Sequence, residues 1–489
     1  MSIPDHDTCY AAIQRRDARF DGRFFTGVKT TGIFCRPSCP ARTPKSGNIT
    51  FYPHAASALA AGFRPCRRCR PELAPGHHEW DRSTELTSRT LKAIEAGVAD
   101  RNGVAGLAHF LGVSERHLRR ELQATIGTTP NQLTKVRRLS IARILLDQTS
   151  LPVSDIAWAS GFGSVRQFND SIRSTFGATP SQLRRQPSTP PQSRPITLSL
   201  RSRGELGWDH LFRFLSSRAI AGLEEAIESD QSDEPPVFRR NTAGGYIDLT
   251  GYDSTLSVRC HIDDLSSVAN ILPRVRAVTD LDTDLEPIAD HLGGDQALAV
   301  TLKQLGPLRV PGAFDLFEVG VRAIVGQQVS VPGARTLLGN LLDATCRRVG
   351  NDDTDQQARP RFDRFCSPEE LAVADLTSLG MPQARKQTIV RLAQAVVDNS
   401  VQFSPHSDPD QLRKSLLSIK GIGPWTAGYI TMRAIKDPDS WPVGDLVLCR
   451  ALGLDTKELA QRAATWSPWR AYGAMLAWNT TCVSPQRST

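Results

Sequence analysis

The chain has 489 residues, and at roughly 100–200 residues per domain this predicts about three to five domains and excludes a single compact module. Apolar residues make up 40% and charged residues 22% of the chain, which are near globular averages and exclude wholesale disorder and fibrous repeats. The sequence contains no run of about 18 uncharged apolar residues, and its start (MSIPDHDTCY) lacks the basic and apolar regions of a signal peptide. We therefore expect a cytoplasmic protein with no membrane partner.

The formal net charge of +8 is unevenly distributed. Residues 1–190 contain 27 Lys and Arg against 15 Asp and Glu, a net +12, whereas the remainder contains 32 against 36, a net −4. A basic segment attracts a polyanion such as nucleic acid through counterion release. Net charge alone does not exclude the alternative, a soluble protein that is basic without binding nucleic acid, so sequence motifs must decide between the two.

Four of the ten cysteines are organised. Cys35 and Cys39 form a C-x3-C pair, Cys66 and Cys69 form a C-x2-C pair, and 26 residues separate the pairs. This spacing suits one tetrahedral four-thiolate zinc site, and a reducing cytosol argues against a disulfide scaffold. The other six are predicted to be structural, and because four of them never cluster we expect no iron–sulfur cluster: Cys9, Cys260, Cys346, Cys366, Cys449 and Cys482.

Residues 1–80 contain only short apolar runs, which predicts a small domain that depends on its metal to fold. Zinc with four thiolates carries a formal charge of about −2. The nearby Arg64, Arg67, Arg68 and Arg70 could neutralise that charge or contact phosphates, and the sequence leaves both open.

Residues 85–185 contain an internal repeat with an offset of 50 residues. GTTPNQL at 127–133 recurs as GATPSQL at 177–183, and the same offset superimposes Leu118, Leu122 and Ile126 on Phe168, Ile172 and Phe176. Apolar positions four residues apart indicate one face of a helix.

A shorter helix is predicted before each of these helices, in 106–114 and 155–164, with turns at Gly112 and Gly161 and N-caps at Ser114 and Ser164. This pattern predicts two helix-turn-helix units; helical hairpins that bind protein are the alternative. The exposed side chains of the second helices could reach phosphates and base edges: Arg116, Arg119, Arg120, Arg166, Gln167, Asn169 and Arg173.

Residues 186–195 (QPSTPPQSRP) predict a linker. Beyond it, alternating patterns predict strands at 196–202, 246–251 and 256–262, with a helix near 208–228. From about residue 285 the spacing is helical, including 317–330, 412–419 and 426–435. An α+β subdomain over 196–284 followed by a helical domain over 285–489 is the simplest interpretation.

The segment 416–434 (LLSIKGIGPWTAGYITMRA) predicts a hairpin between two helices. Gly421 and Gly423 would expose backbone amides that bind a phosphate without reading sequence, although such a turn is also a common structural joint. Downstream, Asp445 begins an apolar helix, where an aspartate usually serves as a cap.

These motifs together resemble known families over nearly the whole chain. VKTTGIFCRPSCPAR and FRPCRRCRPE resemble the zinc domain of the Ada family, and residues 85–185 resemble the paired helix-turn-helix domain of AraC-type regulators. PGAFDLFEVGVRAIVGQQVSV, GIGPWTAGY and WSPWRAYGAMLAW resemble the AlkA-type 3-methyladenine DNA glycosylases. No P-C-H-R segment of the Ada O6-methylguanine methyltransferase domain is present, so the glycosylase replaces it.

The resemblance implies a mainly α, multidomain protein with α+β parts that binds damaged and operator double-stranded DNA. In the zinc domain it places the methyl acceptor for DNA methylphosphotriesters on Cys35. Methylation would remove one negative charge from the site and strengthen DNA binding. A purely structural zinc site is the alternative.

In the glycosylase part the resemblance makes Asp445 the catalytic aspartate and makes Trp425, Tyr429 and Trp478 the lining of a base pocket. A carboxylate would stabilise the positive charge that develops on deoxyribose, and aromatic rings would bind cationic alkylated bases. To reach such a pocket, the nucleotide must leave the duplex.

Two positions refine the resemblance. Trp425 occupies the hairpin position where strand-cutting relatives carry a Schiff-base lysine, which predicts a monofunctional enzyme. Gln328 aligns with the usually apolar wedge; it could fill the vacated space and hydrogen-bond the orphaned base.

The leading hypothesis is a fused alkylation sensor, phosphotriester methyltransferase and 3-methyladenine glycosylase that activates transcription with RNA polymerase. The first alternative is a DNA-binding transcription regulator with an inactive glycosylase-like domain. The second keeps the glycosylase but makes the zinc structural. Because one chain carries two helix-turn-helix units, we expect a monomer.

Overall fold

The computed structural model describes residues 3–17, 20–73, 86–95, 97–184, 195–228, 234–264, 267–346, 362–403 and 407–480. The predicted linker 186–195 lies outside these residues except for its last position. The chain divides into two compact units, Met1–Leu198 with Asp264–Pro273, and Ser199–Asp263 with Arg274–Thr489. In the described part of the chain, we find no helix with the length and apolarity needed to cross a membrane.

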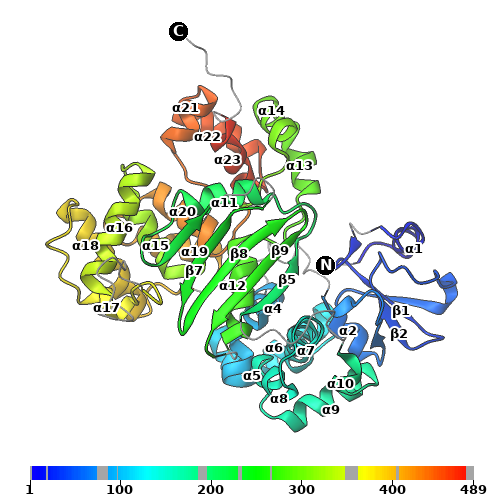
Figure 1. The fold of residues 1–489 in the computed structure, drawn as a ribbon. Coiled ribbons are helices and arrows are strands. Elements are labelled where there is room, and N and C mark those ends of the chain that lie inside the picture. Colours follow the sequence, from blue (N-terminus) through cyan, green and yellow to red (C-terminus); the bar gives the residue numbers. More distant parts are fainter. Residues whose placement is uncertain are drawn as a thin grey trace. The chain divides into compact units, whose positions relative to one another are not determined.

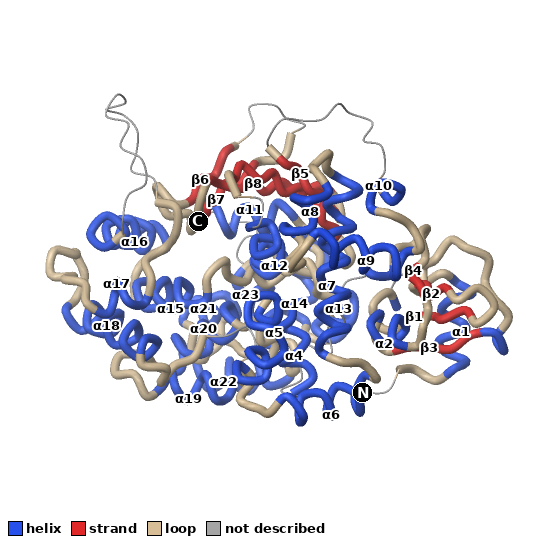
Figure 2. Tube along the Cα trace, turned by 90° about the horizontal axis from the view of Figure 1, so that it is seen from below, coloured by secondary structure: helices blue, strands red, loops and turns tan. Residues whose placement is uncertain are grey.

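The first unit contains a four-stranded sheet in the order β3-β1-β2-β4, of which β1 and β2 are labelled in Figure 1 and all four strands in Figure 2. Strand β1 pairs antiparallel with β2 and β3, whereas β4 runs parallel to β2. The parallel register brings the two cysteine-bearing segments side by side, because β2 ends at Cys35 and β4 ends directly before Cys66. The elements are α1 His6–Arg15, β1 Phe25–Val28, β2 Ile33–Cys35, η2 Ser46–Asn48, β3 Ile49–Tyr52, α2 Ala55–Ala60, β4 Arg64–Pro65 and η3 Pro71–Leu73.

The helical part of the first unit confirms the predicted repeat. Ser114 and Ser164 cap the second helix of each unit by accepting hydrogen bonds from His117 N and Gln167 N, and Gly112 and Gly161 have positive φ. The superimposed apolar residues are all buried. The helices are α4 Leu86–Glu95, α5 Val98–Phe110, α6 Glu115–Ile126, α7 Pro130–Gln148, α8 Val153–Ala159, α9 Val165–Phe176 and α10 Pro180–Leu183.

One hydrophobic cluster joins the cysteine-bearing sheet to the first helix-turn-helix unit. Phe25 and Phe34 of the sheet and Ala56 of α2 belong to the same buried cluster as Leu107 and Leu118. Burial of apolar surface is the main stabilising term in folding, so these two parts of the chain stabilise each other.

The second unit contains a five-stranded sheet in the order β5-β9-β8-β7-β6, drawn as green arrows in Figure 1 and in red in Figure 2. The three predicted strands are confirmed. The predicted helix near 208–228 is wrong in its second half: α11 ends at Ser216 and β6 follows, because residues 224–227 pair with β7. The elements are β5 Ile196–Arg201, α11 Trp208–Ser216, β6 Glu224–Ile227, β7 Val237–Thr242, β8 Gly245–Tyr252 and β9 Thr255–Ile262.

The rest of the second unit is helical, as predicted. The helix expected over 317–330 is interrupted, because α15 ends at Val325 and Gln328 takes a left-handed conformation with φ 53° before α16 begins. The helices are α12 Val268–Val278, of which residues 268–273 belong to the first unit, and then α13 Glu286–Leu292, α14 Gln296–Leu305, α15 Leu316–Val325, α16 Val331–Thr345, α17 Pro368–Ala372, α18 Gln383–Val397, α19 Pro409–Leu417, α20 Pro424–Ala434, α21 Leu446–Leu452, α22 Thr456–Thr465 and α23 Arg470–Trp478.

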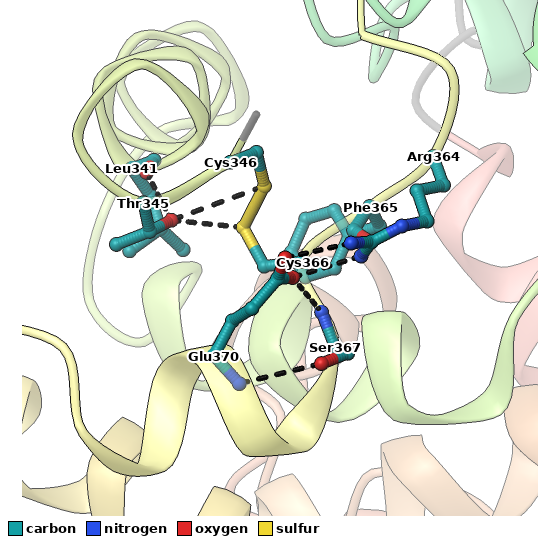
Figure 3. The surroundings of a disulfide bond; sticks show 8 residues. All are labelled: Leu341, Thr345, Cys346, Arg364, Phe365, Cys366, Ser367 and Glu370. Atoms are coloured by element: carbon teal, nitrogen blue, oxygen red, sulfur yellow. Dashed lines mark hydrogen bonds and ion pairs between the residues drawn. A yellow bond between two sulfur atoms is a disulfide. The ribbon is translucent and has the colours of Figure 1, made fainter. Parts of the chain in front are cut away.

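Two of the cysteines that we expected to be scattered and structural form a disulfide, which the sequence did not indicate. Cys346, which follows α16, forms a disulfide with Cys366, which precedes α17, and their Cα atoms are 5.3 Å apart (Figure 3). The Thr345 hydroxyl lies beside both sulfur atoms. Their separation of 20 residues along the chain hid this proximity from the sequence.

Candidate functional site

The four paired cysteines converge on one point. Their sulfur atoms all lie within 4.8 Å of one another, and Cys39 Sγ is 4.0 Å from Cys66 Sγ. Zinc–sulfur bonds of about 2.3 Å place tetrahedral ligands roughly 3.8 Å apart. Cys66 N donates to Phe34 O at 3.0 Å, which fixes the second pair next to Cys35. The predicted four-cysteine arrangement is therefore confirmed, and the donor set fits a zinc ion.

The thiols in this cluster perturb one another. Hydrogen bonding from Cys35 lowers the pKa of Cys39 to about 7 and also lowers the pKa of Cys66. Hydrogen bonding to Cys39 raises the pKa of Cys35. The protein alone thus favours only part of the cluster as thiolates, and a bound cation is needed to hold all four in that form.

Cys35 opens onto a cavity of about 490 Å³ whose lining is largely apolar but includes five arginines. Three of the four arginines around the second cysteine pair lie there: Arg64, Arg67 and Arg68, together with Arg36 and Arg42. Arg70 instead forms an ion pair with Asp147 of α7. The cavity thus combines a sulfur nucleophile with positive charge suited to a phosphate group.

Asp21 organises the loop between Cys35 and Cys39. Its carboxylate accepts hydrogen bonds from Ser38 N at 3.0 Å and Ser38 Oγ at 2.6 Å, and Arg36 lies 3.4 Å away. We missed this residue in the sequence because it lies outside the cysteine motif and carries no spacing signal.

The residues predicted to contact DNA lie on the second helices of the two repeat units. Their exposed members are Arg116, Arg119 and Arg120 on α6 and Arg166, Gln167 and Arg173 on α9. Arg119 also pairs with Glu115 at 3.2 Å, and Arg166 lies 4.0 Å from Asp170. These exposed pairs contribute little to stability, so the guanidinium groups can exchange partners.

The turn between α19 and α20 in the second unit contains both predicted glycines, and Gly423 is the N-cap residue of α20. Gly421 has φ 105°, and a Cβ there would lie 2.0 Å from Thr388 Oγ1. A side chain at this position is therefore excluded by both conformation and space. Gly421 is exposed, and Gly423 is partly exposed and opens α20.

Asp445 caps α21, as its position predicted, and it also has contacts that a simple cap would not need. Asp445 Oδ1 accepts hydrogen bonds from Val447 N at 2.9 Å and Leu448 N at 2.8 Å. Trp425 Nε1 donates to Oδ2 at 2.7 Å, and Trp478 Nε1 donates to Oδ1 at 3.3 Å. The structure thus brings both predicted tryptophans to this carboxylate, which is only 5% exposed.

Tyr429 completes the aromatic group. Its ring stacks on Trp425 with centroids 5.4 Å apart, and Trp478 lies 6.3 Å away. Arg433 donates to the phenol oxygen at 2.8 Å. Burial raises the pKa of Tyr429, but the positive charges of Arg433 and Arg218 outweigh it, so the pKa lies below its ordinary value.

Neither arginine was identified in the sequence. The spacing of four residues between Tyr429 and Arg433 on one helix could have shown their proximity. Arg218 offered no such signal, because it comes from the segment after α11 and reaches the phenol only through the tertiary fold.

Gln328, the predicted wedge, lies on the turn between α15 and α16 and is exposed. Its neighbour Gln327, which we did not single out, attaches this turn to the hairpin by donating to Gly421 O at 3.1 Å and Thr426 Oγ1 at 2.8 Å. Arg385 donates to Gln327 O at 2.5 Å. The turn and the hairpin are therefore held together while the Gln328 side chain remains free of the core.

The chain matches three family models: the metal binding domain of Ada over residues 8–72, a helix-turn-helix domain over 107–186 and the AlkA N-terminal domain over 197–315. A Mycobacterium tuberculosis protein named "Probable bifunctional transcriptional activator/DNA repair enzyme AlkA" is 37% identical over 97% of this chain and 96% of its own length.

Two Escherichia coli proteins match separate parts of the chain. DNA-3-methyladenine glycosylase 2 is 29% identical over 58% of this chain and 96% of its own length. The bifunctional transcriptional activator/DNA repair enzyme Ada is 37% identical over 36% of this chain and 49% of its own length. The full-length match together with the convergent cysteines establishes that the chain belongs to the family of bifunctional transcriptional activator/DNA repair enzymes.

Proposed function

We propose that the second unit is a monofunctional DNA glycosylase that removes alkylated bases such as 3-methyladenine, with Asp445 as its catalytic carboxylate. The observation that carries this proposal is the buried Asp445 carboxylate within the group formed by Trp425, Tyr429 and Trp478. The similarity to DNA-3-methyladenine glycosylase 2 supports the substrate class.

In the proposed reaction the bond between C1′ of deoxyribose and the base nitrogen breaks, and its electron pair leaves with the base. Asp445 stabilises the positive charge that develops on the sugar. A water molecule then bonds to C1′ and releases a proton. A base that is already cationic leaves as a neutral molecule, and the aromatic rings bind it by stacking and cation–π attraction.

The test is base release from methylated duplex DNA by wild type and Asp445→Asn in parallel. Asparagine retains an oxygen acceptor for the cap but loses the charge, so release by the folded variant should fall by at least about 100-fold. Undiminished release by the variant would refute the catalytic assignment. Absence of release by wild type would favour the regulator with an inactive glycosylase-like domain.

We further propose that Cys35 accepts a methyl group from DNA methylphosphotriesters. Cys35, Cys39, Cys66 and Cys69 would hold zinc, which keeps the thiols deprotonated. The Cys35 sulfur bonds to the methyl carbon, the carbon–oxygen bond breaks, and the phosphodiester leaves with the electron pair. The product is a neutral, irreversible thioether, and the site has lost one negative charge. Support comes from the five arginines in the lining of the cavity beside Cys35.

Peptide mass mapping after incubation with methylated DNA tests this assignment. One added methyl group should appear on the peptide that contains Cys35 but not on peptides with Cys66 and Cys69. A methyl group on another of the four cysteines would show that Cys35 is not the acceptor. If none of the four is methylated, the zinc site has a structural role only. Metal analysis should find one zinc per chain and no iron, as expected if the chain holds no iron–sulfur cluster.

Within this proposal the domains are 1–80, 85–185, 196–284 and 285–489. The exposed residues of α6 and α9 contact operator DNA, whereas Gln328, Gly421 and Gly423 contact damaged DNA. Methylated protein binds its operator more tightly and activates transcription through RNA polymerase, and the chain acts as a cytoplasmic monomer. Operator affinity before and after Cys35 methylation, measured at one salt concentration, tests the regulatory step.

A further inference from the structure

The hydrogen bonds on Asp445 are divided unequally between its two oxygens. Oδ1 receives three donors, the amides of Val447 and Leu448 and the indole of Trp478. Oδ2 receives one, the indole of Trp425 at 2.7 Å. A carboxylate offers about two lone-pair positions on each oxygen, so acceptor capacity remains on Oδ2 alone.

We infer that Oδ2 is the oxygen that faces the reacting sugar and that Trp425 is the positioning residue that orients it. This inference rests on the proposed glycosylase function and assigns Trp425 a role that stacking does not require. The indole N–H fixes the direction of the remaining lone pair on Oδ2. The longer bond from Trp478 reaches the oxygen that the helix amides already saturate.

Phenylalanine substitutions separate the hydrogen bond from the aromatic ring. Trp425→Phe keeps a ring against Tyr429 but removes the donor to Oδ2, and Trp478→Phe removes the donor to Oδ1. Trp466→Phe is the matched control, because Trp466 Nε1 donates to the carboxylate of Asp295 at 2.9 Å, another indole–carboxylate bond in the same unit. Two measurements are needed for each protein: the single-turnover rate of base release and the affinity for lesion-containing duplex.

Trp425→Phe should slow single-turnover release by about 10- to 100-fold, since hydrogen bonds to charged groups are strong. Affinity for the duplex should stay within about twofold. Trp478→Phe should slow release less, and Trp466→Phe should leave the rate of the folded protein unchanged. Full-rate release by Trp425→Phe, or an equal loss in Trp466→Phe, would overturn the inference. Wild-type protein without activity would instead refute the proposed function.

In the first unit, side chains of the cysteine-bearing part of the chain contact the carboxyl ends of α6 and α9. The last residues of α6 and α9, Ile126 and Phe176, occupy equivalent positions in the 50-residue repeat. Ser57 Oγ of α2 donates to Ile126 O, and Arg67 Nη2 donates to Phe176 O at 3.1 Å. The cysteine-bearing part of the chain therefore contacts the carboxyl end of both helices at the same repeat position.

Arg67, which makes the contact with α9, is a sequence neighbour of the cysteines that would bind the metal. Arg67 lies between Cys66 and Cys69 in sequence, and Phe176 lines the same cavity as Cys35. A Cβ at Gly177, which follows α9, would lie 3.0 Å from Arg64 Nη1. Helix carboxyl ends carry unsatisfied carbonyls and favour positive charge, so the two arginines stabilise this end of α9.

We propose that metal binding at the four cysteines braces α9 through Arg67 and thereby fixes the placement of the second helix-turn-helix unit beside the first. Two helices that read one duplex must keep a spacing that matches the DNA. The metal site would then control DNA binding through this brace as well as through its charge. The contact with α6 depends less on the metal, because α6 also shares a hydrophobic cluster with the sheet.

Hydrogen exchange of the full chain, followed by mass spectrometry, tests the brace. Zinc removal by a chelator should speed exchange in the last turn of α9 more than in the last turn of α6. With zinc bound, Arg67→Ala should speed exchange at α9 by about threefold to tenfold, and Ser57→Ala should act on α6 alone. Arg68→Ala, which removes another guanidinium from the same cavity, should change neither. Unchanged exchange at α9 in the chelated protein or in Arg67→Ala would overturn the proposal.

Discussion

Gly428 of α20 lies against the backbone of Trp441, so closely that a Cβ at position 428 would be 2.1 Å from the Trp441 carbonyl oxygen. α20 carries Trp425 and Tyr429, and the segment that begins at Trp441 leads to Asp445. This close approach therefore sets the distance between the aromatic residues and the carboxylate.

Gly428→Ala should separate α20 from that segment, because backbone atoms cannot give way as a flexible side chain can. We expect a loss of about 1–3 kcal/mol in the free energy of unfolding and at least about tenfold slower base release. Gly339→Ala in α16 is the control, since no atom lies within 4 Å of its Cβ position. It should retain activity and gain stability from helix propensity. Equal behaviour of the two variants in denaturant titrations would contradict this prediction.

Gln328→Ala should weaken activity on duplex DNA while leaving single-stranded DNA almost unaffected. The side chain is exposed on a left-handed turn, where it can enter a duplex, and a single strand has no stack to open. The ratio of base release from methylated duplex to release from methylated single strand should fall by about tenfold. An unchanged ratio would show that a residue other than Gln328 fills the space that the flipped nucleotide leaves in the duplex.

Glu318→Gln should destabilise the second unit strongly. Glu318 is 4% exposed and accepts hydrogen bonds from Arg240 at 2.6 Å and Arg322 at 2.7 Å. Removing one charge leaves buried guanidinium groups without full compensation, at a cost of about 3–5 kcal/mol. Glu370→Gln, which breaks a more exposed pair with Arg364, should cost less than about 1 kcal/mol in the same denaturant titration.

Because of Glu72, the free energy of unfolding should fall as pH rises. Burial raises the pKa of Glu72 to about 7, although Arg143 and Arg70 oppose the shift. A raised folded-state pKa stabilises the protein while the carboxyl is protonated, and this contribution is lost between about pH 4.5 and pH 7. Glu72→Gln should remove that dependence and be about 2–3 kcal/mol more stable than wild type at pH 8. The exposed-site variant Glu115→Gln should follow wild type across the same pH series.

Local sequence signals predicted a large part of this structure. The cysteine spacing, the repeat, and the caps at Ser114 and Ser164 depend on residues close in sequence, and the structure confirms them. The aromatic residues around Asp445 came from resemblance, and their hydrogen bonds to its carboxylate could not be read from spacing.

The features that escaped prediction depend on contacts between distant segments. Strand β6 follows α11 because its residues pair with β7. Cys346 meets Cys366 because α16 and the segment before α17 lie side by side (Figure 3). Asp21 and Arg218 act on sites formed by residues far along the chain. The spacing of apolar residues shows which face of a helix or strand is buried, but it does not show which other element packs against that face.

The hydrophobic cluster that contains both Phe34 and Leu118 has a consequence for modularity. A cut near residue 80 would expose apolar surface on both fragments, so neither is expected to be stable alone. The cysteine-bearing sheet and the first helix-turn-helix unit should therefore unfold in one thermal transition. The segment that folds cooperatively would then extend past residue 80, where we proposed that the first domain ends.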